Sequence, residues 1–452
     1  MKLNVHALIV ALLFLIPSPC LAEEVAPAPG PEPSMVQGGG PPPLSSYDEY
    51  YKNYEEFVRV VKLIQEKYVK DIKLPELFQG AYRGMLEGLD PYSQFFGPEE
   101  LEELKVETEG KFGGLGIEVI VRDGVLYVIS PILDSPAFRA GVMVGDRIIK
   151  IEGTSTENMS LRDAVRRLRG EPNTGVTITV VHQGEAQPTD IVIVRDIIQV
   201  HCIRGARILD EEAKIGYMAL ISFQDNTLEE MDKALNELMG KGMKALILDL
   251  RFNPGGLLNM AVAVSDRFLS QGVIVSTKGR EEEQNQVYLA TEGDTYSDLP
   301  LVILVNTGSA SAAEIVAGAI QDYKRGLIVG TKTFGKGSVQ SLIGVEEEHC
   351  ALKLTTALYY TPSGKSIDHI GIEPDVKVEL TPAETKALHE YLSKVNITSQ
   401  TGEQLPQEDT FVDLQLHRAI EIIKEGKFSL YLLSSVEATN ESPLLKNVNP
   451  GH

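Results

Sequence analysis

The sequence has no tryptophan and only three cysteines among its 452 residues. It contains no Cys-x-x-Cys pair and no His-Glu-x-x-His motif, which argues against a zinc-thiolate site and excludes a metalloprotease helix. The Gly-x-Ser-x-Gly motif of α/β-hydrolases is also absent. We therefore expect a protein that needs no metal ion and no organic cofactor.

Positive charge is scarce, because 42 lysines and arginines face 64 aspartates and glutamates, a formal net charge of -22. A nucleic-acid backbone or an anionic membrane surface would on average repel such a chain. We therefore expect no nucleic-acid partner. The hydrophobic fraction of 43% and the length are sufficient for two or three packed cores.

Long hydrophobic runs are scarce as well. The first residues, Met1 and Lys2, precede an apolar run from about residue 6 to residue 16, and small residues follow up to Ala22. The run is short for a membrane span, and the pattern predicts a signal peptide over residues 1–22, with an uncleaved anchor as the alternative. The protein is then exported, to a periplasmic or extracellular location, or membrane-associated if the signal stays. Its removal leaves Cys202 and Cys350, either as a disulfide or as two buried thiols.

Changes in composition and periodicity divide the first half of the chain. Residues 23–46 form a Pro/Gly-rich linker that cannot build a core. Helical spacing of apolar residues predicts an N-terminal helical region over 47–104. Over residues 111–196, short strand-like runs surround one helix that Ser160 opens, which predicts a small mixed domain.

The second half alternates buried strands with helical stretches over residues 197–380, which predicts a layered α/β domain with largely parallel strands. Residues 381–452 form a C-terminal helical region around a polar linker near residues 396–409, and the sequence assigns it no role. The fold class is therefore α/β multidomain.

A polar turn, Asn306–Ala310, joins the apolar run over 301–305 to an apolar helix. In one interpretation Ser311 caps this helix and Glu314 completes a capping box. In the other, the Ser311 hydroxyl is a nucleophile exposed at the end of the sheet. Backbone N–H groups and the positive end of the helix would then stabilise an oxyanion beside it.

A serine nucleophile needs a base, and a lysine amine can serve if burial keeps it neutral near pH 7. Lys336 is a candidate, and Gln340 could fix the direction of its amine. Its neighbours permit close approach and desolvation: Phe334, Gly335, Gly337 and Val339. The alternatives are a solvated loop lysine and a phosphate-binding loop over 330–336, although that loop would need Ser or Thr at position 337.

Six blocks together resemble the carboxy-terminal processing proteases, also called tail-specific proteases. The blocks occur in order between about residues 50 and 380: Leu89–Ser93, Phe112–Ile117, Asp249–Gly256, Ser309–Glu314, Gly330–Gln340 and Tyr359–Ile367. The resemblance implies a PDZ domain over 111–196, inserted before a crotonase-like Ser-Lys protease core over 197–380.

The resemblance also implies roles for individual residues. The family's nucleophile is the second serine of Ser-Ala-Ser, here Ser311, and its base lysine lies 25 residues downstream, here Lys336 (336 minus 311). The glutamine four residues further on is Gln340. The implied oxyanion donors are the N–H groups of Ala312 and of one of two glycines: Gly255 or Gly256. The sequence departs from the family pattern at Tyr92 and Phe252.

The implied PDZ domain would bind a substrate C-terminus as an added strand. The strand would lie beside Ile117, and the terminal carboxylate would accept from the N–H groups of three residues: Gly114, Leu115 and Gly116. An apolar helix face would also be offered, for which core packing is the alternative: Leu161, Ala164, Val165 and Leu168. Arg169 and Gly170, which close this helix, would couple peptide capture to the protease core.

The sequence therefore predicts a serine endopeptidase that uses a Ser-Lys dyad to cleave exported proteins with accessible C-termini. We expect homo-oligomers through the helical regions, and a regulatory or adaptor protein as a further partner. Two alternatives stay open. One is a catalytically silent PDZ-type binding or scaffold protein, and the other is a crotonase-like enzyme acting on acyl-CoA.

Overall fold

The computed structural model describes residues 44–122, 124–132, 134–293, 296–345, 350–401 and 412–426. The predicted signal peptide and all but the last three residues of the predicted linker lie outside these ranges. The chain divides into two compact units. The first contains the residues up to Leu101 together with Gln340–Thr355, and the second contains the rest.

The first unit is built from helices and the end of a hairpin. Its helices are α1 (Leu44–Lys67) and α2 (Leu74–Glu87), as the apolar spacing predicts, and α1 begins within the last three residues of the predicted linker. Strand β1 (Gln94–Phe96), which was not predicted, pairs antiparallel with the first residues of β18 (Cys350–Tyr360). Strand β17 (Ser338–Val345) is also a neighbour of β18. A small core forms here: Leu86, Phe95 and Cys350.

The second unit contains a small β-rich domain, preceded by α3 (Pro98–Glu109). Its strands are β2 (Lys111–Gly114), β3 (Ile117–Arg122), β4 (Val125–Pro131), β5 (Arg147–Ile151), β6 (Thr154–Ser155), β7 (Gly175–Val181), β8 (Thr189–Val194) and β9 (Asp196–Gln199), and its helices are α4 (Pro136–Arg139) and α5 (Leu161–Leu168). The main sheet has the order β3-β4-β5-β7-β8, so β3 is an edge strand. Ser160 caps α5 as predicted, because its Oγ accepts from the Asp163 N–H at 3.1 Å.

The larger α/β domain of the second unit has a six-stranded sheet of order β10-β11-β12-β15-β16-β19. Its strands are β10 (Ile203–Asp210), β11 (Ile215–Leu220), β12 (Ala245–Asp249), β15 (Leu301–Val305), β16 (Leu327–Gly330) and β19 (Val376–Lys377). All neighbours pair parallel except β10 with β11. The predicted layered, largely parallel α/β architecture is therefore confirmed. A hairpin of β13 (Val273–Gly279) and β14 (Val287–Leu289), with a turn of 3-10 helix (Glu282–Gln284), packs beside it.

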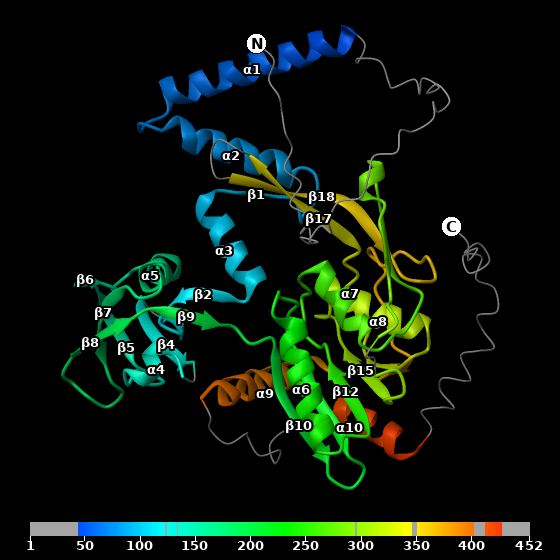
Figure 1. Ribbon diagram of the computed structural model, residues 1–452. Helices are drawn as coiled ribbons and strands as arrows, with labels where there is room; N and C mark the ends of the chain where they lie inside the picture. Colours follow the sequence, from blue (N-terminus) through cyan, green and yellow to red (C-terminus); the bar gives the residue numbers. More distant parts are fainter. Residues whose placement is uncertain are drawn as a thin grey trace, which may run out of the picture. The chain divides into compact units, whose positions relative to one another are not determined.

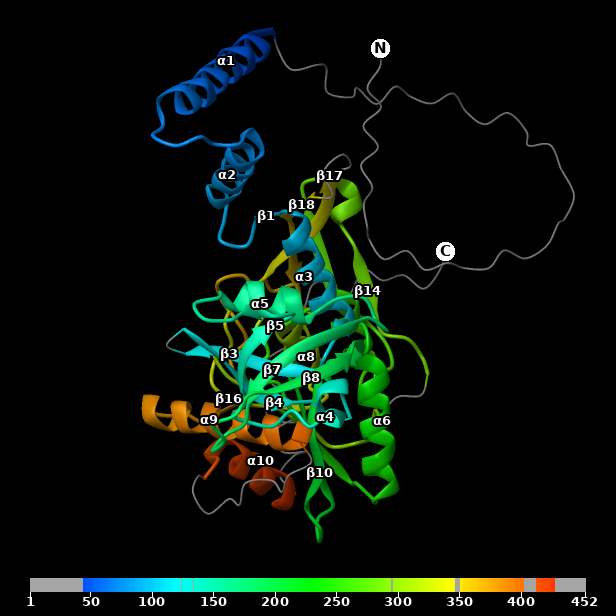
Figure 2. The ribbon, with the colours of Figure 1, turned by 90° about the vertical axis from the view of Figure 1, so that its left-hand side faces the viewer.

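Helices cover both faces of this sheet (Figures 1 and 2). On one face lie α6 (Thr227–Gly240), α7 (Leu258–Asp266) and α8 (Ala312–Asp322), and on the other lies α10 (Leu414–Lys424). The surroundings of strand β15 explain why its residues form an unbroken apolar run. Its side chains alternate between the two cores, Ile303 in one and Val302 and Leu304 in the other. The carboxyl ends of β12 and β15 are where the candidate site begins.

Within the described residues 381–401 and 412–426, the C-terminal region is mainly helical, as predicted, but its first helix is longer than predicted. Helix α9 runs over Pro382–Thr401, where a linker was expected from residue 396 onwards. None of the described helices is both long and apolar enough to cross a bilayer. Cys202 lies in the core of the second unit, and burial raises the pKa of its thiol to about 12.

The packing of β11 gives a test of the core. Met218 on β11 is fully buried, whereas Met239 on α6 is 43% exposed. We expect Met218→Ala to lower the free energy of unfolding by about 2–5 kcal/mol through loss of apolar contact and the cavity left behind. The matched variant Met239→Ala should change it by less than about 0.5 kcal/mol. Urea unfolding followed by far-UV circular dichroism measures both, and equal losses would show that the layer assignment is wrong.

Candidate active site

The turn between β15 and α8 is strained at Ser311. Its backbone angles are φ 56° and ψ -116°, whereas a helix-capping residue is normally extended. A residue with a side chain pays on the order of 1–3 kcal/mol for such a conformation, which persists mainly at functional sites. In α/β-hydrolases a strained strand-to-helix turn of this kind exposes the nucleophilic serine. Ser311 is partly exposed and occupies the equivalent place without the sequence motif.

The neighbouring serine has a different environment. Ser309 is fully buried; its Oγ donates to the Leu250 carbonyl at 2.7 Å and accepts from the Asn306 N–H at 3.0 Å. The Ala310 N–H donates to the Asn253 carbonyl at 2.9 Å. These bonds fix the turn against the loop that follows β12. Ser309 therefore shapes the turn, and Ser311 presents the accessible hydroxyl.

The side chain of Glu314 joins this turn to the lysine loop. It is fully buried, and its carboxylate accepts four hydrogen bonds: from the N–H groups of Ser311 (2.9 Å), Lys336 (2.8 Å) and Gly335 (2.7 Å), and from Thr333 Oγ1 (2.5 Å). Four donors match the lone-pair sites of a carboxylate, so the cost of burying its charge is offset. The bond to Ser311 belongs to the predicted capping interaction. The other three come from the lysine loop, and no local sequence pattern indicates them.

Glu314 and Tyr359 together fix the backbone of Lys336. The Lys336 N–H donates to Glu314, its carbonyl accepts from the Tyr359 hydroxyl, and its side chain is partly buried. A side chain at Gly337 would place its Cβ 2.3 Å from the Asp368 N, so the loop needs glycine there. The chain then enters β17 rather than a helix, which excludes the phosphate-loop interpretation.

One neighbour of Lys336 differs from expectation. Phe334 was expected to help remove water from the amine, but its side chain is 58% exposed. Its N–H donates to the Ser309 carbonyl at 3.0 Å, and this bond turns the backbone of Phe334 toward the serine loop. Val339 is partly buried and packs against the main core.

Gln340 lies in the first unit, where it belongs to a chain of hydrogen bonds. Its Nε2 donates to Thr355 Oγ1 at 3.3 Å, and Thr355 Oγ1 donates to Asp90 Oδ1 at 3.2 Å. Ser93 Oγ donates to Asp90 Oδ2 at 2.7 Å. Burial works to raise the pKa of Asp90, but the hydrogen bonds from Ser93, Tyr92 and Thr355 outweigh it and lower that pKa. The sequence leaves the role of the Leu89–Ser93 block open. In the structure, the block supplies Asp90 and Ser93 to this chain of hydrogen bonds.

The glycine loop after β12 packs directly against the serine turn. A methyl group at Gly255, where φ is 101°, would lie 2.7 Å from Ser311 Cβ and 2.9 Å from the Ala312 N. The Gly255 N–H donates to Asn253 Oδ1 at 2.8 Å, and Gly256 pairs with Phe223 as a parallel bridge. Ala312 is the first residue of α8, so its N–H has no acceptor within the helix. Of the three predicted oxyanion residues, Gly255 and Ala312 therefore lie beside Ser311, whereas Gly256 contacts Phe223.

In the small domain, the sequence predicts a peptide groove between strand β3, which is an edge strand, and helix α5. A pocket of about 450 Å³ borders the helix and is lined by Glu103, Leu161, Arg162, Val165 and Arg169. Two predicted residues, Leu161 and Val165, line it, whereas Ala164 and Leu168 are core residues. The Leu115 side chain is buried, its carbonyl accepts from the Ala137 N–H at 2.9 Å, and Ile117 packs partly against the core.

Charged side chains also line this pocket. Arg162 pairs with Glu103 of α3 at 3.2 Å, and both side chains are about half exposed. The Arg169 guanidinium lies 4.6 Å from the centre of the Phe112 ring. The Gly116 carbonyl accepts from the Ile132 N–H at 2.8 Å, and the Gly170 N–H donates to the Gly113 carbonyl at 3.1 Å. The residues at 113–116 are thus tied to their surroundings through their carbonyl groups.

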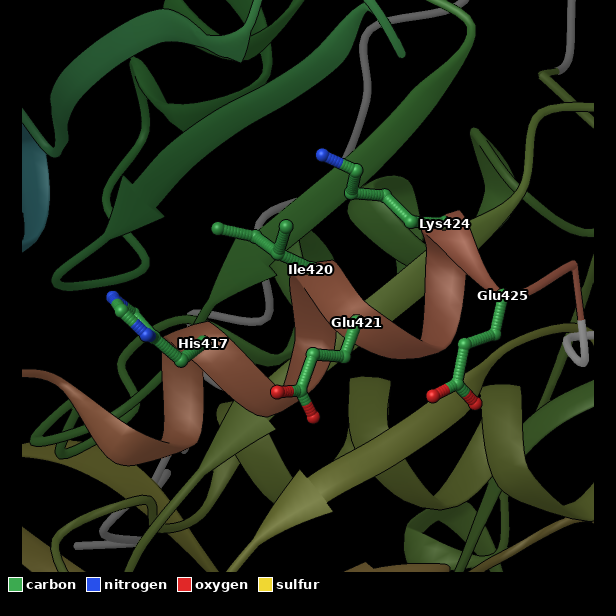
Figure 3. Close-up of a pocket in the computed structure, with 5 residues that line it drawn as sticks. All are labelled: His417, Ile420, Glu421, Lys424 and Glu425. Atoms are coloured by element: carbon green, nitrogen blue, oxygen red, sulfur yellow. The ribbon is translucent and has the colours of Figure 1, made fainter.

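A second pocket of about 450 Å³ lies on the outer face of α10 (Figure 3). Glu421 and Glu425 point to one side of the helix, and Ile420 and Lys424 point to the other. Among the lining residues the structure describes, none is buried, and none is a predicted site residue. The candidate chemistry therefore stays at Ser311 and Lys336.

Comparison with known proteins gives matches over most of the chain. The sequence models of Peptidase family S41, the PDZ domain and the Activating protease CtpB N-terminal domain match residues 214–378, 113–193 and 43–99. A carboxy-terminal-processing protease of Bartonella bacilliformis is 44% identical over 73% of this chain and 76% of that protein. The carboxy-terminal processing protease CtpA of Bacillus subtilis is 34% identical over 74% of this chain and 70% of that protein.

Among solved structures, a photosystem II D1 C-terminal processing protease is 30% identical, with a TM-score of 0.43, over 76% of this chain and 90% of that chain. A PDZ domain joined to an α/β peptidase core defines a PDZ-containing serine-type peptidase. Its helical segments precede and follow these two domains. The chain belongs to the carboxy-terminal processing proteases of peptidase family S41.

The buried carboxylate gives a direct test of the site. In Glu314→Gln an amide NH₂ replaces one oxygen and faces N–H donors that it cannot accept from. We expect the rate of casein cleavage to fall roughly 100-fold, because small displacements of reacting groups cost about that much. Glu373→Gln is the matched control, since Glu373 is 61% exposed and pairs only at the surface with Lys332. A Glu314→Gln protein that is folded and cleaves casein at the normal rate would contradict this role.

Proposed function

We propose that the protein is an exported endopeptidase in which Ser311 is the nucleophile and Lys336 is its general base. The observation that carries the proposal is the strained backbone of Ser311 at the N-terminus of α8, tied through one buried carboxylate to the backbone of Lys336. The family membership supports it, because the serine and lysine stand at the positions that the family's motifs give them. A silent scaffold would have no need to keep a strained serine.

The proposed reaction is acyl transfer. Neutral Lys336 removes the proton from Ser311 Oγ, and the oxygen attacks the substrate carbonyl carbon. The N–H groups of Ala312 and of Gly255 or Gly256 then stabilise the oxyanion. Lys336 gives its proton to the leaving amine. The Lys336 amine, neutral again, then activates a water molecule, which releases the acyl group and regenerates the serine.

The Gly255 N–H already donates to Asn253 Oδ1, so its use as an oxyanion donor requires that bond to be exchanged or shared. Use of the Gly256 N–H as the donor would leave the hydrogen bond to Asn253 unchanged. We therefore propose Gly256 and Ala312 as the pair of donors to be tested first, with Gly255 serving to let the two loops approach. The role of Gln340 stays a prediction from the sequence.

Substrates would be proteins with accessible C-termini, because the PDZ domain binds peptide C-termini. We propose that the terminal residue enters the pocket beside Leu161 and Val165 while the chain lies along β3. The N-terminal signal pattern supports export to a periplasmic or extracellular location. Large apolar side chains exposed on α1 support homo-oligomers through this helix: Tyr50, Tyr51, Tyr54, Phe57, Val60 and Leu63.

Removal of either member of the proposed dyad should abolish cleavage. We expect Ser311→Ala and Lys336→Met each to lower the rate of casein cleavage by at least about 1000-fold, and the double variant to be no worse than either, because the two act as a unit. Lys332→Met, at a lysine that is 47% exposed in the same loop, should leave the rate unchanged. Cleavage by Ser311→Ala would overturn the proposed nucleophile, and a wild-type protein that cleaves nothing would favour the scaffold alternative.

Peptide capture can be tested without catalysis, in full-length Ser311→Ala. We expect a labelled peptide with a free carboxylate to bind about tenfold or more tightly than its C-terminal amide, since the amide loses a charge-assisted contact. Val165→Asp should weaken binding of the free peptide, whereas Val192→Asp, at a residue 70% exposed on β8, should not. Fluorescence anisotropy measures both. Equal binding of acid and amide would rule out carboxylate recognition.

A further inference from the structure

The side chain of Arg251 lies fully buried immediately after β12. A guanidinium has five N–H donors, and all five have acceptors here. Nε donates to Asp249 (2.9 Å), Nη2 donates to Asp249 and Asp413 (2.7 Å each), and Nη1 donates to Asp413 (2.9 Å) and to Gln415 Oε1 (3.2 Å). Two of these three acceptor residues belong to the C-terminal segment, which lies outside the match to the peptidase family.

The C-terminal segment is firmly attached at this point. Asp413 is the N-cap of α10 and accepts from the Leu416 N–H at 3.0 Å, while the buried Gln415 donates to the Val378 carbonyl at 3.0 Å. Burial works to raise the pKa of Asp413, but the charge and hydrogen bonds of Arg251 lower it below its usual range. The apolar side of α10 packs against the central sheet: Leu416, Ala419 and Ile422.

Arg251 leads directly into the loop that contacts the nucleophile. The next residue, Phe252, has a φ of 58°, and its N–H donates to Asn306 Oδ1 at 2.9 Å. The same Asn306 oxygen accepts from the Gly308 N–H at 2.9 Å, two residues before the serine turn ends at Ala310. The C-terminal region contacts the loop a second time, because the His389 ring of α9 lies edge-on to Phe252 at 5.2 Å.

We propose that Asp413 and Gln415 are positioning residues of the peptidase, and that the start of α10 completes the active site from outside the residues that match the peptidase family. In this account, α10 holds Arg251, Arg251 fixes the direction of the loop over 252–256, and the loop sets the oxyanion donor beside Ser311. The inference rests on the proposed function of Ser311. It gives a role to the C-terminal region that the sequence left unassigned.

The test compares the two ends of α10. Asp413→Asn removes the charge that holds Arg251, and Gln415→Met removes one uncharged acceptor, so Gln415→Met carries the test if Asp413→Asn fails to fold. Lys424→Met is the matched control. It breaks the ion pair of Lys424 with Asp210 at 2.8 Å, which ties down the far end of the same helix.

We expect kcat for a peptide substrate to fall about 10- to 100-fold in Asp413→Asn and several-fold in Gln415→Met, with KM changed by less than about twofold. The peptide affinity of the PDZ domain and the kcat of Lys424→Met should stay at wild-type values. Normal kcat in folded Asp413→Asn would overturn the proposal. Equal loss in Lys424→Met would overturn it as well, because α10 would then act only through overall stability.

A second readout separates this inference from the proposed function. Hydrogen exchange followed by mass spectrometry, in the Ser311→Ala background, reports the loop over residues 250–258 without any need for cleavage. We expect exchange there to be several-fold faster in Asp413→Asn and unchanged in Lys424→Met. Faster exchange supports the positioning role even if the wild-type protein proves inactive, and unchanged exchange contradicts it.

Discussion

One buried carboxylate connects the two loops of the candidate active site. Glu314 accepts from the backbone of Ser311 on one side and from the backbone of Lys336 on the other, with Thr333 and Gly335 filling its remaining positions. Because the carboxylate is fully buried and has four donors, neither loop can move without leaving a buried charge unsatisfied. The strain at Ser311 is therefore maintained by the loop that carries its proposed base, Lys336. The sheet brings these loops together, since the serine turn follows β15 and the lysine loop follows β16.

The sequence predicts those parts of the fold that local periodicity determines. Helix α8 begins directly after Ser311, as the capping pattern predicts, and the fully buried strand β15 forms the predicted apolar run because both of its faces are covered. The strands β17 and β18 were not predicted, because their partly buried residues mix polar and apolar types without clear alternation. The role of Glu314 was hidden for another reason. Its spacing from Ser311 fits an ordinary capping box, and a local pattern cannot reveal donors about 20 residues further along the chain.

The C-terminal segment illustrates the same limit over a longer distance. Asp413 and Gln415 lie beyond the predicted linker and belong to no motif in the sequence, but they bond Arg251, which lies 162 and 164 residues away in the sequence. A buried ion pair of this kind adds little net stability, because the cost of removing the charges from water offsets their attraction. Its value lies in geometry, since a planar guanidinium with five satisfied donors has one orientation. The peptidase core is thus completed by a helix that the family match does not include.

The proposed mechanism requires the Ser311 hydroxyl and the Lys336 amine to be in contact. A crystal structure of the full chain after inactivation with a peptidyl fluorophosphonate would measure it. We predict phosphorus bonded to Ser311 Oγ and a phosphonyl oxygen within hydrogen-bond distance of the Ala312 N–H and of one glycine N–H after β12. We also predict the Lys336 Nζ against the adduct, with Glu314 still bonded to both loops. Labelling of a different serine, or a Lys336 side chain directed into solvent away from the adduct, would contradict the account.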